Sequence, residues 1–175
     1  MNQEYLKKLF NYEPDTGKLI WKDYAGNRCV KPLTEAGYIH NTLGCRYVQV
    51  DKKLYKAHRL IWLWYYGGWP ENHIDHINHN PSDNRICNLR DVTHIENHKN
   101  TSRRGSNKSG FTGVSFYKRD KNWQAYIDVD TKRIHHGKFK NKEDAIKVRK
   151  EAEIKYGYHE NHGKEKGSLD SPEKD

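Results

Sequence analysis

The local fold of this chain is decided by the stretch His73-Ile-Asp-His-Ile-Asn-His-Asn-Pro-Ser-Asp-Asn-Arg-Ile-Cys-Asn-Leu-Arg-Asp-Val-Thr-His-Ile-Glu-Asn-His98. Polar and apolar residues alternate at residues 73–75, which indicates a short strand. Residues 78–84 are rich in Asn, Asp, Ser and Pro, which favour a loop, and residues 88–92 indicate a second strand. The order predicted up to this point is therefore strand, loop, strand.

A helix is expected directly after the second strand. Thr93 and Glu96 are spaced as a capping box, in which Thr93 caps the first turn and Glu96 occupies its third helical position. This places Asn97 on the first turn of that helix. From there its side chain is able to point back at the end of the first strand, where Asp75 and His76 lie.

Three of these side chains supply the parts that phosphodiester hydrolysis requires. The reaction needs a hard cation to neutralise developing charge, and a base to deprotonate water near neutral pH. Asp75 offers an anionic oxygen ligand and Asn97 a neutral one. The His76 imidazole titrates in the range in which a base is useful.

Further residues across the first half match the motifs of one known family, in the same order along the chain. They are Tyr12-Glu-Pro-Asp-Thr-Gly-Lys-Leu-Ile-Trp21, Ala36-Gly-Tyr38, His58-Arg-Leu60, Asp75-His76, Asn84, Asn88-Leu89 and Glu96-Asn97. With these motifs the chain resembles the His-Asn-His (HNH) nuclease family, in the phage and intron-encoded branch whose last His is replaced by Asn. The resemblance implies that Asp75 and Asn97 bind one divalent ion, Mg²⁺ or Mn²⁺. It also implies that His76 is the general base and that Asn88 orients the His76 imidazole through backbone hydrogen bonds across the ββα hairpin.

Other polar residues of the first half have two interpretations each. The remaining histidines of the stretch are expected to bind phosphate or solvent, namely His73, His79, His94 and His98. A structural zinc site that combines them with Cys87 is the alternative. His58 and Arg59 lie in residues 57–65, for which a buried helix is preferred over a buried strand. These two side chains either pack structurally or contact DNA.

Positive charge gathers in the second half of the chain. The formal net charge of the whole chain is +9, and residues 101–150 alone hold 14 Lys and Arg against 5 Asp and Glu. Residues 101–110 lack apolar side chains and are rich in Gly, Ser, Lys and Arg, which predicts a flexible basic linker. Its Arg103 and Arg104 are expected to contact DNA, since clustered cations near an aromatic-rich domain are typical of nucleic-acid binding.

Residues 111–163 are predicted to form three strands followed by one helix. The helix begins near Asn141, a plausible N-cap, and ends before Gly157; it presents the stripe Ala145, Val148, Ala152 and Tyr156 to the apolar face of the sheet. The opposite face then stays uncovered, with Ser115, Tyr117, Arg119, Gln124, Tyr126, Arg133 and His135 on it and Lys138 nearby. A polar, basic sheet face of this kind suits major-groove binding by strands.

Four motifs of this second half carry a further resemblance. They are Ser109-Gly-Phe-Thr-Gly-Val-Ser115, Trp123-x-Ala-x-Ile127, His136-Gly-Lys-Phe139 and Glu143-Asp-Ala145. They resemble the apetala/ethylene-response-factor DNA-binding domain, a module also attached to phage HNH nucleases. Ser115 and Tyr117 stand where the plant domains usually present Arg, so the base preference of those domains does not carry over.

The sequence therefore predicts an α+β protein of two small domains. An N-terminal ββα-metal nuclease domain (1–100) precedes the linker (101–110), the three-stranded antiparallel sheet with one helix (111–163) and a disordered tail (164–175). The expected function is that of a homing-like, divalent-metal-dependent endonuclease acting on double-stranded DNA. A non-catalytic DNA-binding or regulatory protein with a lapsed nuclease core is the alternative, and a structural RNA-binding protein is a third interpretation.

Composition and hydropathy bear on location and assembly. The longest uninterrupted apolar run, Leu60–Tyr66, is too short to cross a bilayer, and the N-terminus lacks the apolar region of a signal peptide. We expect no membrane partner and a location in the cytoplasm, of the host cell if the protein is phage-encoded. One chain carries one predicted site, so a monomer should nick one strand, and a dimer stays open.

Overall fold

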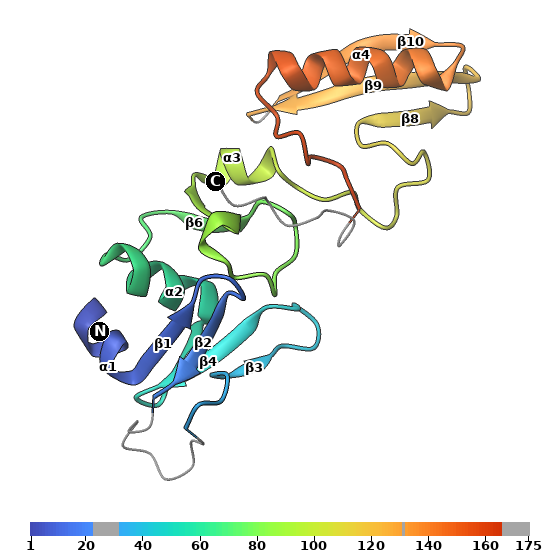
Figure 1. Ribbon diagram of the computed structural model, residues 1–175. Coiled ribbons are helices and arrows are strands. Elements are labelled where there is room, and N and C mark those ends of the chain that lie inside the picture. The colour runs from blue at the N-terminus through green and yellow to red at the C-terminus, as the bar shows by residue number, and fades with distance from the viewer. Residues whose placement is uncertain (23–31, 131, 166–175) are drawn as a thin grey trace. The chain divides into compact units, whose positions relative to one another are not determined.

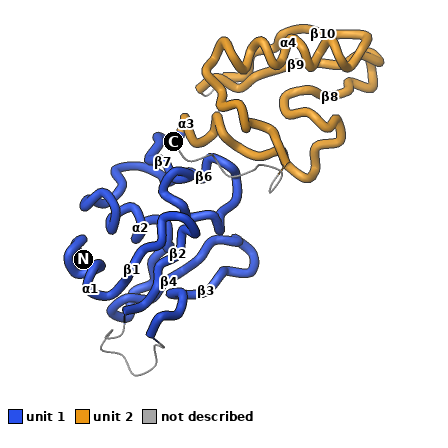
Figure 2. The backbone as a smooth tube through the Cα atoms, viewed as in Figure 1, with its two compact units in different colours: residues 1–94, 170–175 blue, residues 95–169 orange. Residues whose placement is uncertain are grey.

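The computed structural model describes residues 1–22, 32–130 and 132–165. Packing contacts divide them into two compact units, the first ending at His94 and the second beginning at Ile95 (Figure 2). The sequence placed the division later, at residues 101–110. This linker is hydrogen-bonded within the second unit, since the Arg103 amide donates to the Lys164 carbonyl at 3.0 Å. The domain limits stay a prediction, and the proposed disordered tail lies outside the described residues from 166 onward.

The first unit consists of short helices and antiparallel strands (Figure 1). In chain order they are α1 (Gln3–Leu9), β1 (Phe10–Glu13), β2 (Lys18–Trp21), β3 (Tyr38–Ile39), β4 (Arg46–Val50), β5 (Lys53–Lys56), α2 (Ala57–Tyr66), β6 (His73–His76), the 3-10 turn η1 (Ile86–Asn88) and β7 (Leu89–Val92). β1 pairs with β2, β4 lies between β3 and β5, and β6 pairs with β7. The β6–β7 pair confirms the two strands predicted on either side of the loop.

The core of the first unit forms around α2. Its Leu60, Ile61 and Leu63 are buried and pack with Phe10 and other apolar residues of α1, β1, β2 and β4. The helix preferred for residues 57–65 is therefore confirmed. It ends at Gly67, which adopts a left-handed conformation with φ of 84°, a conformation that costs glycine little.

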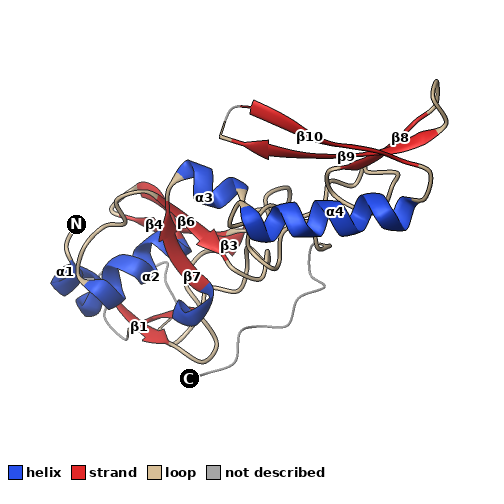
Figure 3. Cartoon of the chain, turned by 90° about the horizontal axis from the view of Figure 1, so that it is seen from above, coloured by secondary structure: helices blue, strands red, loops and turns tan. Residues whose placement is uncertain are grey.

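The second unit contains the end of α3 (His94–His98), then β8 (Val114–Tyr117), β9 (Asn122–Val129), β10 (Lys132–Phe139) and α4 (Lys142–Lys155). The three strands form one antiparallel sheet in the order β10-β9-β8, and α4 runs along one of its faces (Figure 3). The predicted sheet with one helix is confirmed. The buried stripe of α4 differs from the prediction, because Arg149 joins Ala145 and Ala152 in it.

The described chain is thus a mixed α and β structure with small antiparallel sheets. Two separate hydrophobic cores hold it together, one in each unit. Within residues 1–22, 32–130 and 132–165, no helix combines the length and the hydropathy that crossing a membrane requires.

Candidate active site and nucleic-acid interface

The β6–β7 hairpin presents the predicted metal ligand Asp75. This carboxylate is buried, and its Oδ2 accepts hydrogen bonds from Arg90 Nε at 2.9 Å and Nη2 at 2.7 Å. Asp75 and Arg90 are direct partners in the antiparallel register. A buried carboxylate needs such compensation, because removing an unpaired charge from water is costly. The sequence analysis missed Arg90, although the register of two short strands was the signal that could have found it.

The predicted general base, His76, follows Asp75 at the end of β6. Its Nε2 lies 3.0 Å from Asn84 Oδ1, and its ring meets the ring of His58 edge-on at 5.1 Å between centroids. Burial lowers the pKa of His76 below its ordinary value of 6.5, and the hydrogen bond to Asn84 acts in the opposite direction. The imidazole is therefore neutral near neutral pH, as a proton acceptor must be.

His58 lies inside the first unit rather than on its surface. Its ring is 7% exposed, and burial, with the nearby His76 next in effect, lowers its pKa to about 3. A direct contact with DNA would require this ring to be uncovered, so its role in the structure is to pack against His76. Arg59 donates to the carbonyls of Asn72 at 3.2 Å and Pro70 at 3.4 Å, which holds the chain after α2.

Asn88 stabilises the loop between the two strands. Its Nδ2 donates to Asn78 Oδ1 at 2.9 Å and to the Asp83 carbonyl at 2.8 Å, and its Oδ1 accepts from the Asn78 amide at 3.0 Å. Its own carbonyl accepts from the amide of Ile77 at 3.0 Å. Asn88 thus holds the backbone that follows His76, and its role in orienting the imidazole stays a prediction. The side chain at hydrogen-bond distance from the imidazole is that of Asn84.

The second predicted ligand, Asn97, lies half-buried in α3 and belongs to the second unit. Its pairing with Asp75 therefore stays a prediction. The donor chemistry fits a small hard cation, because Asp75 and Asn97 offer one carboxylate and one amide oxygen. Among the residues that the structure describes, no three His, Cys, Asp or Glu side chains gather as a ready metal cage.

One comparison with known proteins found a match over the region that contains this hairpin. Residues 55–99 match the HNH endonuclease family. The match runs from β5 through α2 and the β6–β7 hairpin to the end of α3, and it includes Asp75, His76, Asn88 and Asn97. This HNH region indicates nuclease activity in general. The search of curated proteins found no match, and the search of solved structures found none either.

Outside the HNH region, the predicted polar face of the second unit is observed. Ser115 pairs with Gln124, which also pairs with Lys138, while Tyr126 pairs with His135. Residues paired across strands share one face of a sheet. These side chains therefore form one surface, on the side opposite the apolar residues that α4 covers. We call this surface the polar sheet face, and it also includes Tyr117 and Arg133.

Acidic side chains form ion pairs with several cations on or beside the polar sheet face. Arg133 donates to both carboxylate oxygens of Asp128, at 2.8 and 3.0 Å, and its guanidinium lies 4.0 Å from the centroid of the Tyr126 ring. The hydrogen bond from Arg133 lowers the pKa of Asp128. The cations of Arg119 and Lys138 each lie beside Tyr117, at 5.7 and 5.6 Å from its ring centroid.

The same two cations also pair with Asp120. Of the linker residues, Arg103 pairs with Glu165, whereas Arg104 is exposed. The contacts of Arg103 and Arg104 with DNA stay a prediction.

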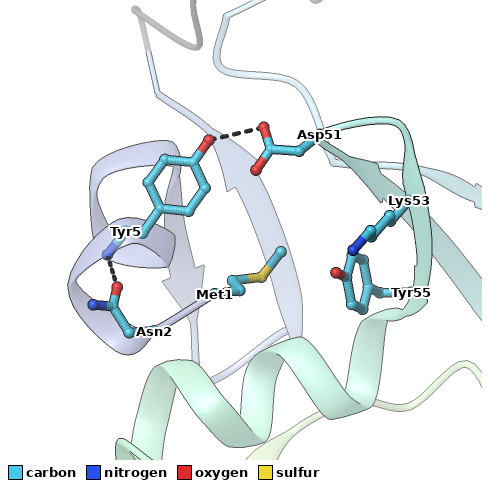
Figure 4. A pocket seen from close by; sticks show the side chains of 6 residues that line it. All are labelled: Met1, Asn2, Tyr5, Asp51, Lys53 and Tyr55. Carbon is cyan, nitrogen blue, oxygen red and sulfur yellow. Dashed lines mark hydrogen bonds between the residues drawn. The ribbon is translucent and has the colours of Figure 1, made fainter.

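One further surface hollow lies at the N-terminal end of the first unit. It is lined by Met1, Asn2, Tyr5, Asp51, Lys53 and Tyr55 (Figure 4). The Tyr5 hydroxyl donates to Asp51 Oδ1 at 2.9 Å across its mouth. None of the proposed catalytic side chains lines this hollow.

Proposed function

We propose that this protein is a divalent-metal-dependent DNA endonuclease of the HNH type. One observation carries the proposal: the HNH region coincides with the hairpin in which a buried carboxylate, Asp75, adjoins a neutral imidazole, His76. A metal ligand and a general base on consecutive residues suit hydrolysis at a single phosphodiester bond.

In the proposed mechanism His76 takes the proton from the attacking water. Asp75 and Asn97 would hold an Mg²⁺ or Mn²⁺ ion, whose charge would stabilise the leaving 3′ oxygen. Arg90 holds the Asp75 carboxylate in place through two hydrogen bonds to its Oδ2 before DNA arrives. Asn88 fixes the loop beneath the imidazole, so the base does not need to reorganise during the reaction.

The second unit would bind double-stranded DNA through the polar sheet face. Support comes from the concentration of positive charge in residues 101–150 and from the resemblance to the apetala/ethylene-response-factor domain. Exposed cations such as Arg104 and Arg119 would contact phosphates, and Gln124 and Tyr126 would face base edges. A homing-like role, phage origin and nicking by a monomer belong to the same proposal.

One observation favours the alternative of a non-catalytic DNA-binding protein. Arg90 already neutralises Asp75, and a guanidinium at this position weakens the attraction of a cation to the carboxylate. In a lapsed nuclease this ion pair would replace the metal permanently.

The test is incubation of the purified chain with a DNA of its source locus, with and without Mg²⁺, followed by mapping of the ends. Discrete nicks that require Mg²⁺ and disappear in His76→Ala support the endonuclease. Retained, salt-sensitive binding without any cleavage in Mg²⁺ or Mn²⁺ supports the alternative.

A further inference from the structure

The side chain of Asn84 is the direct hydrogen-bond partner of the His76 imidazole. Its Oδ1 lies 3.0 Å from His76 Nε2. An amide oxygen only accepts hydrogen bonds, so the ring nitrogen at this contact carries the hydrogen. In a neutral imidazole with Nε2 protonated, Nδ1 bears the lone pair. The contact therefore selects one of the two neutral tautomers.

The other nearby amide cannot perform this task. Both side-chain atoms of Asn88 are used within the loop, on Asn78 and on the carbonyl of Asp83. His58 meets His76 through ring packing. Of these three side chains, Asn84 is the one whose oxygen lies at hydrogen-bond distance from the His76 ring.

Asn84 is itself held by the first hairpin of the chain. It is 2% exposed, and its carbonyl accepts a hydrogen bond from the Tyr12 hydroxyl at 3.1 Å. The same hydroxyl accepts from the Ile86 amide at 2.9 Å. Gly17, in the turn after β1, has φ of +71°, and a Cβ there would lie 2.5 Å from the Arg85 nitrogen and 2.6 Å from the Asn84 carbonyl carbon. The β1–β2 hairpin thus packs directly against the backbone of Asn84.

We infer that Asn84 is a positioning residue that holds His76 in its Nε2-protonated form and leaves Nδ1 as the proton acceptor, with Tyr12 and Gly17 clamping Asn84 from the β1–β2 hairpin. The catalytic part of this inference rests on the proposed function, in which His76 is the general base. Partners that orient a metal-ligating histidine through its second nitrogen typically matter by about 10- to 100-fold in metal affinity or activity, and we expect an effect of the same order for a histidine that acts as a base.

The first experiment reads the tautomer without any cleavage. Long-range ¹H–¹⁵N spectra of the full, ¹⁵N-labelled chain are recorded at a pH where the ring is neutral, and the His76 signals are assigned by their loss in His76→Ala. We expect Nε2 to be the protonated nitrogen, with a slowly exchanging proton. Asn84→Leu should lose the protection of that proton, and Asn84→Asp should keep it because an acceptor oxygen remains. A wild-type ring protonated at Nδ1, or an unchanged signal in Asn84→Leu, overturns the inference.

The second experiment measures cleavage by the same preparations. Asn84→Leu should lower kcat about 10- to 100-fold with KM for DNA unchanged, and Asn84→Asp should recover most of the rate. Asn84→Ala removes the acceptor without adding bulk and serves if the Leu variant does not fold. A folded Asn84→Ala that cuts at the wild-type rate refutes the positioning role. If the wild-type chain does not cut at all, the proposed function fails, and the spectra still decide the tautomer.

Discussion

Removal of one hydroxyl, in Tyr12→Phe, tests how the first hairpin supports the candidate site. The hydroxyl donates to the Asn84 carbonyl and accepts from the Ile86 amide, and the Tyr12 side chain is 6% exposed. Phenylalanine keeps the ring and its packing against Trp64, whose centroid lies 5.6 Å away. The substitution therefore isolates the two hydrogen bonds.

The expected loss follows from what the substitution leaves behind. A partly buried amide and a buried carbonyl lose their partner together, and each unsatisfied buried group costs about 1–3 kcal/mol. We expect the free energy of unfolding of the first unit to fall by about 2–4 kcal/mol, toward the lower end if water enters the space. With a urea dependence of about 2 kcal/mol per molar, the middle of the usual range, the midpoint should move by roughly 1–2 M.

Tryptophan fluorescence during urea unfolding measures this change. Trp21, Trp62, Trp64 and Trp69 all lie in the first unit, so the signal reports mainly on it. Tyr5→Phe is the matched control, since its hydroxyl makes an exposed hydrogen bond to Asp51 (Figure 4); exposed changes of this kind stay within about 0.5 kcal/mol. Equal effects of the two substitutions would refute the reasoning.

Alkaline pH gives a second measurement of the same hydroxyl. Burial raises the pKa of Tyr12 above its ordinary value of 10. The folded state therefore binds this proton more tightly than the unfolded state does. Its contribution is fully present below pH 10 and is lost as the pH rises further. Tyr12→Phe should reduce the alkaline loss of stability, whereas Tyr5→Phe, at an exposed site, should change it much less.

Four other outcomes are expected. His76→Ala should lower the cleavage rate by roughly 10²- to 10⁴-fold with DNA affinity unchanged. The wild-type rate should rise with pH through a midpoint below 6.5, because burial lowers the pKa of His76. A midpoint above 7 contradicts this expectation. Chelation should abolish cleavage without shifting the thermal unfolding midpoint, and a tightly held zinc whose removal melts the first unit would overturn the Asp75 assignment. Arg119→Ala should weaken DNA binding and reduce the slope of log K against log salt by about 1, whereas an unchanged slope removes this cation from the interface. Stability should fall as pH drops from about 6.5 toward 3, since the unfolded state protonates His58 first, and His58→Gln should flatten that decline in urea titrations.

Local patterns predicted the elements that carry the candidate site. Alternation located β6, turn residues located the loop after it, and Thr93 directly precedes the observed start of α3. The helix at residues 57–65 was predicted for the same reason, since Gly67 provides a local stop. Each of these signals lies within a few residues of its effect, which is why sequence alone is sufficient.

Pairing over longer distances was not predictable in this way. Tyr12 and Glu13 belong to β1, because they pair with Leu19 and Lys18 of β2, and no local pattern of the sequence predicts this pairing. The burial of Arg149 likewise depends on the backbone of Gly113, beside which its side chain passes. The periodicity of a helix does not predict a buried guanidinium, because a charged residue next to an apolar stripe is expected to lie at the exposed edge of that stripe.

The candidate site shows the same division between local and distant information. Asp75 and His76 were predicted from their residue types and their place in the strand, and Asn88 from the resemblance to the HNH family. The contact of Asn84 with the imidazole was not, because the ten residues of loop and turn between Ile77 and Asn88 fix it through their own hydrogen bonds. The sequence showed that Asn84 belongs to a family motif, but its contact with the His76 imidazole is seen only in the folded loop.

The alternation of strand β6 explains how two neighbouring residues acquire opposite chemistry. Successive side chains of a strand point to opposite faces, so Asp75 shares a face with its register partner Arg90, while His76 points to the other face and meets the ring of His58. On the first face, the Arg90 guanidinium compensates the buried carboxylate of Asp75. On the second face, burial disfavours the charged form of the His76 imidazole. Asp75 thus has a cationic partner, whereas His76 lies in a buried site that favours its neutral form, and this is the separation of roles that metal and acid–base chemistry require of adjacent groups. A shift of the β6 register by a single residue would exchange the two environments and remove both roles together.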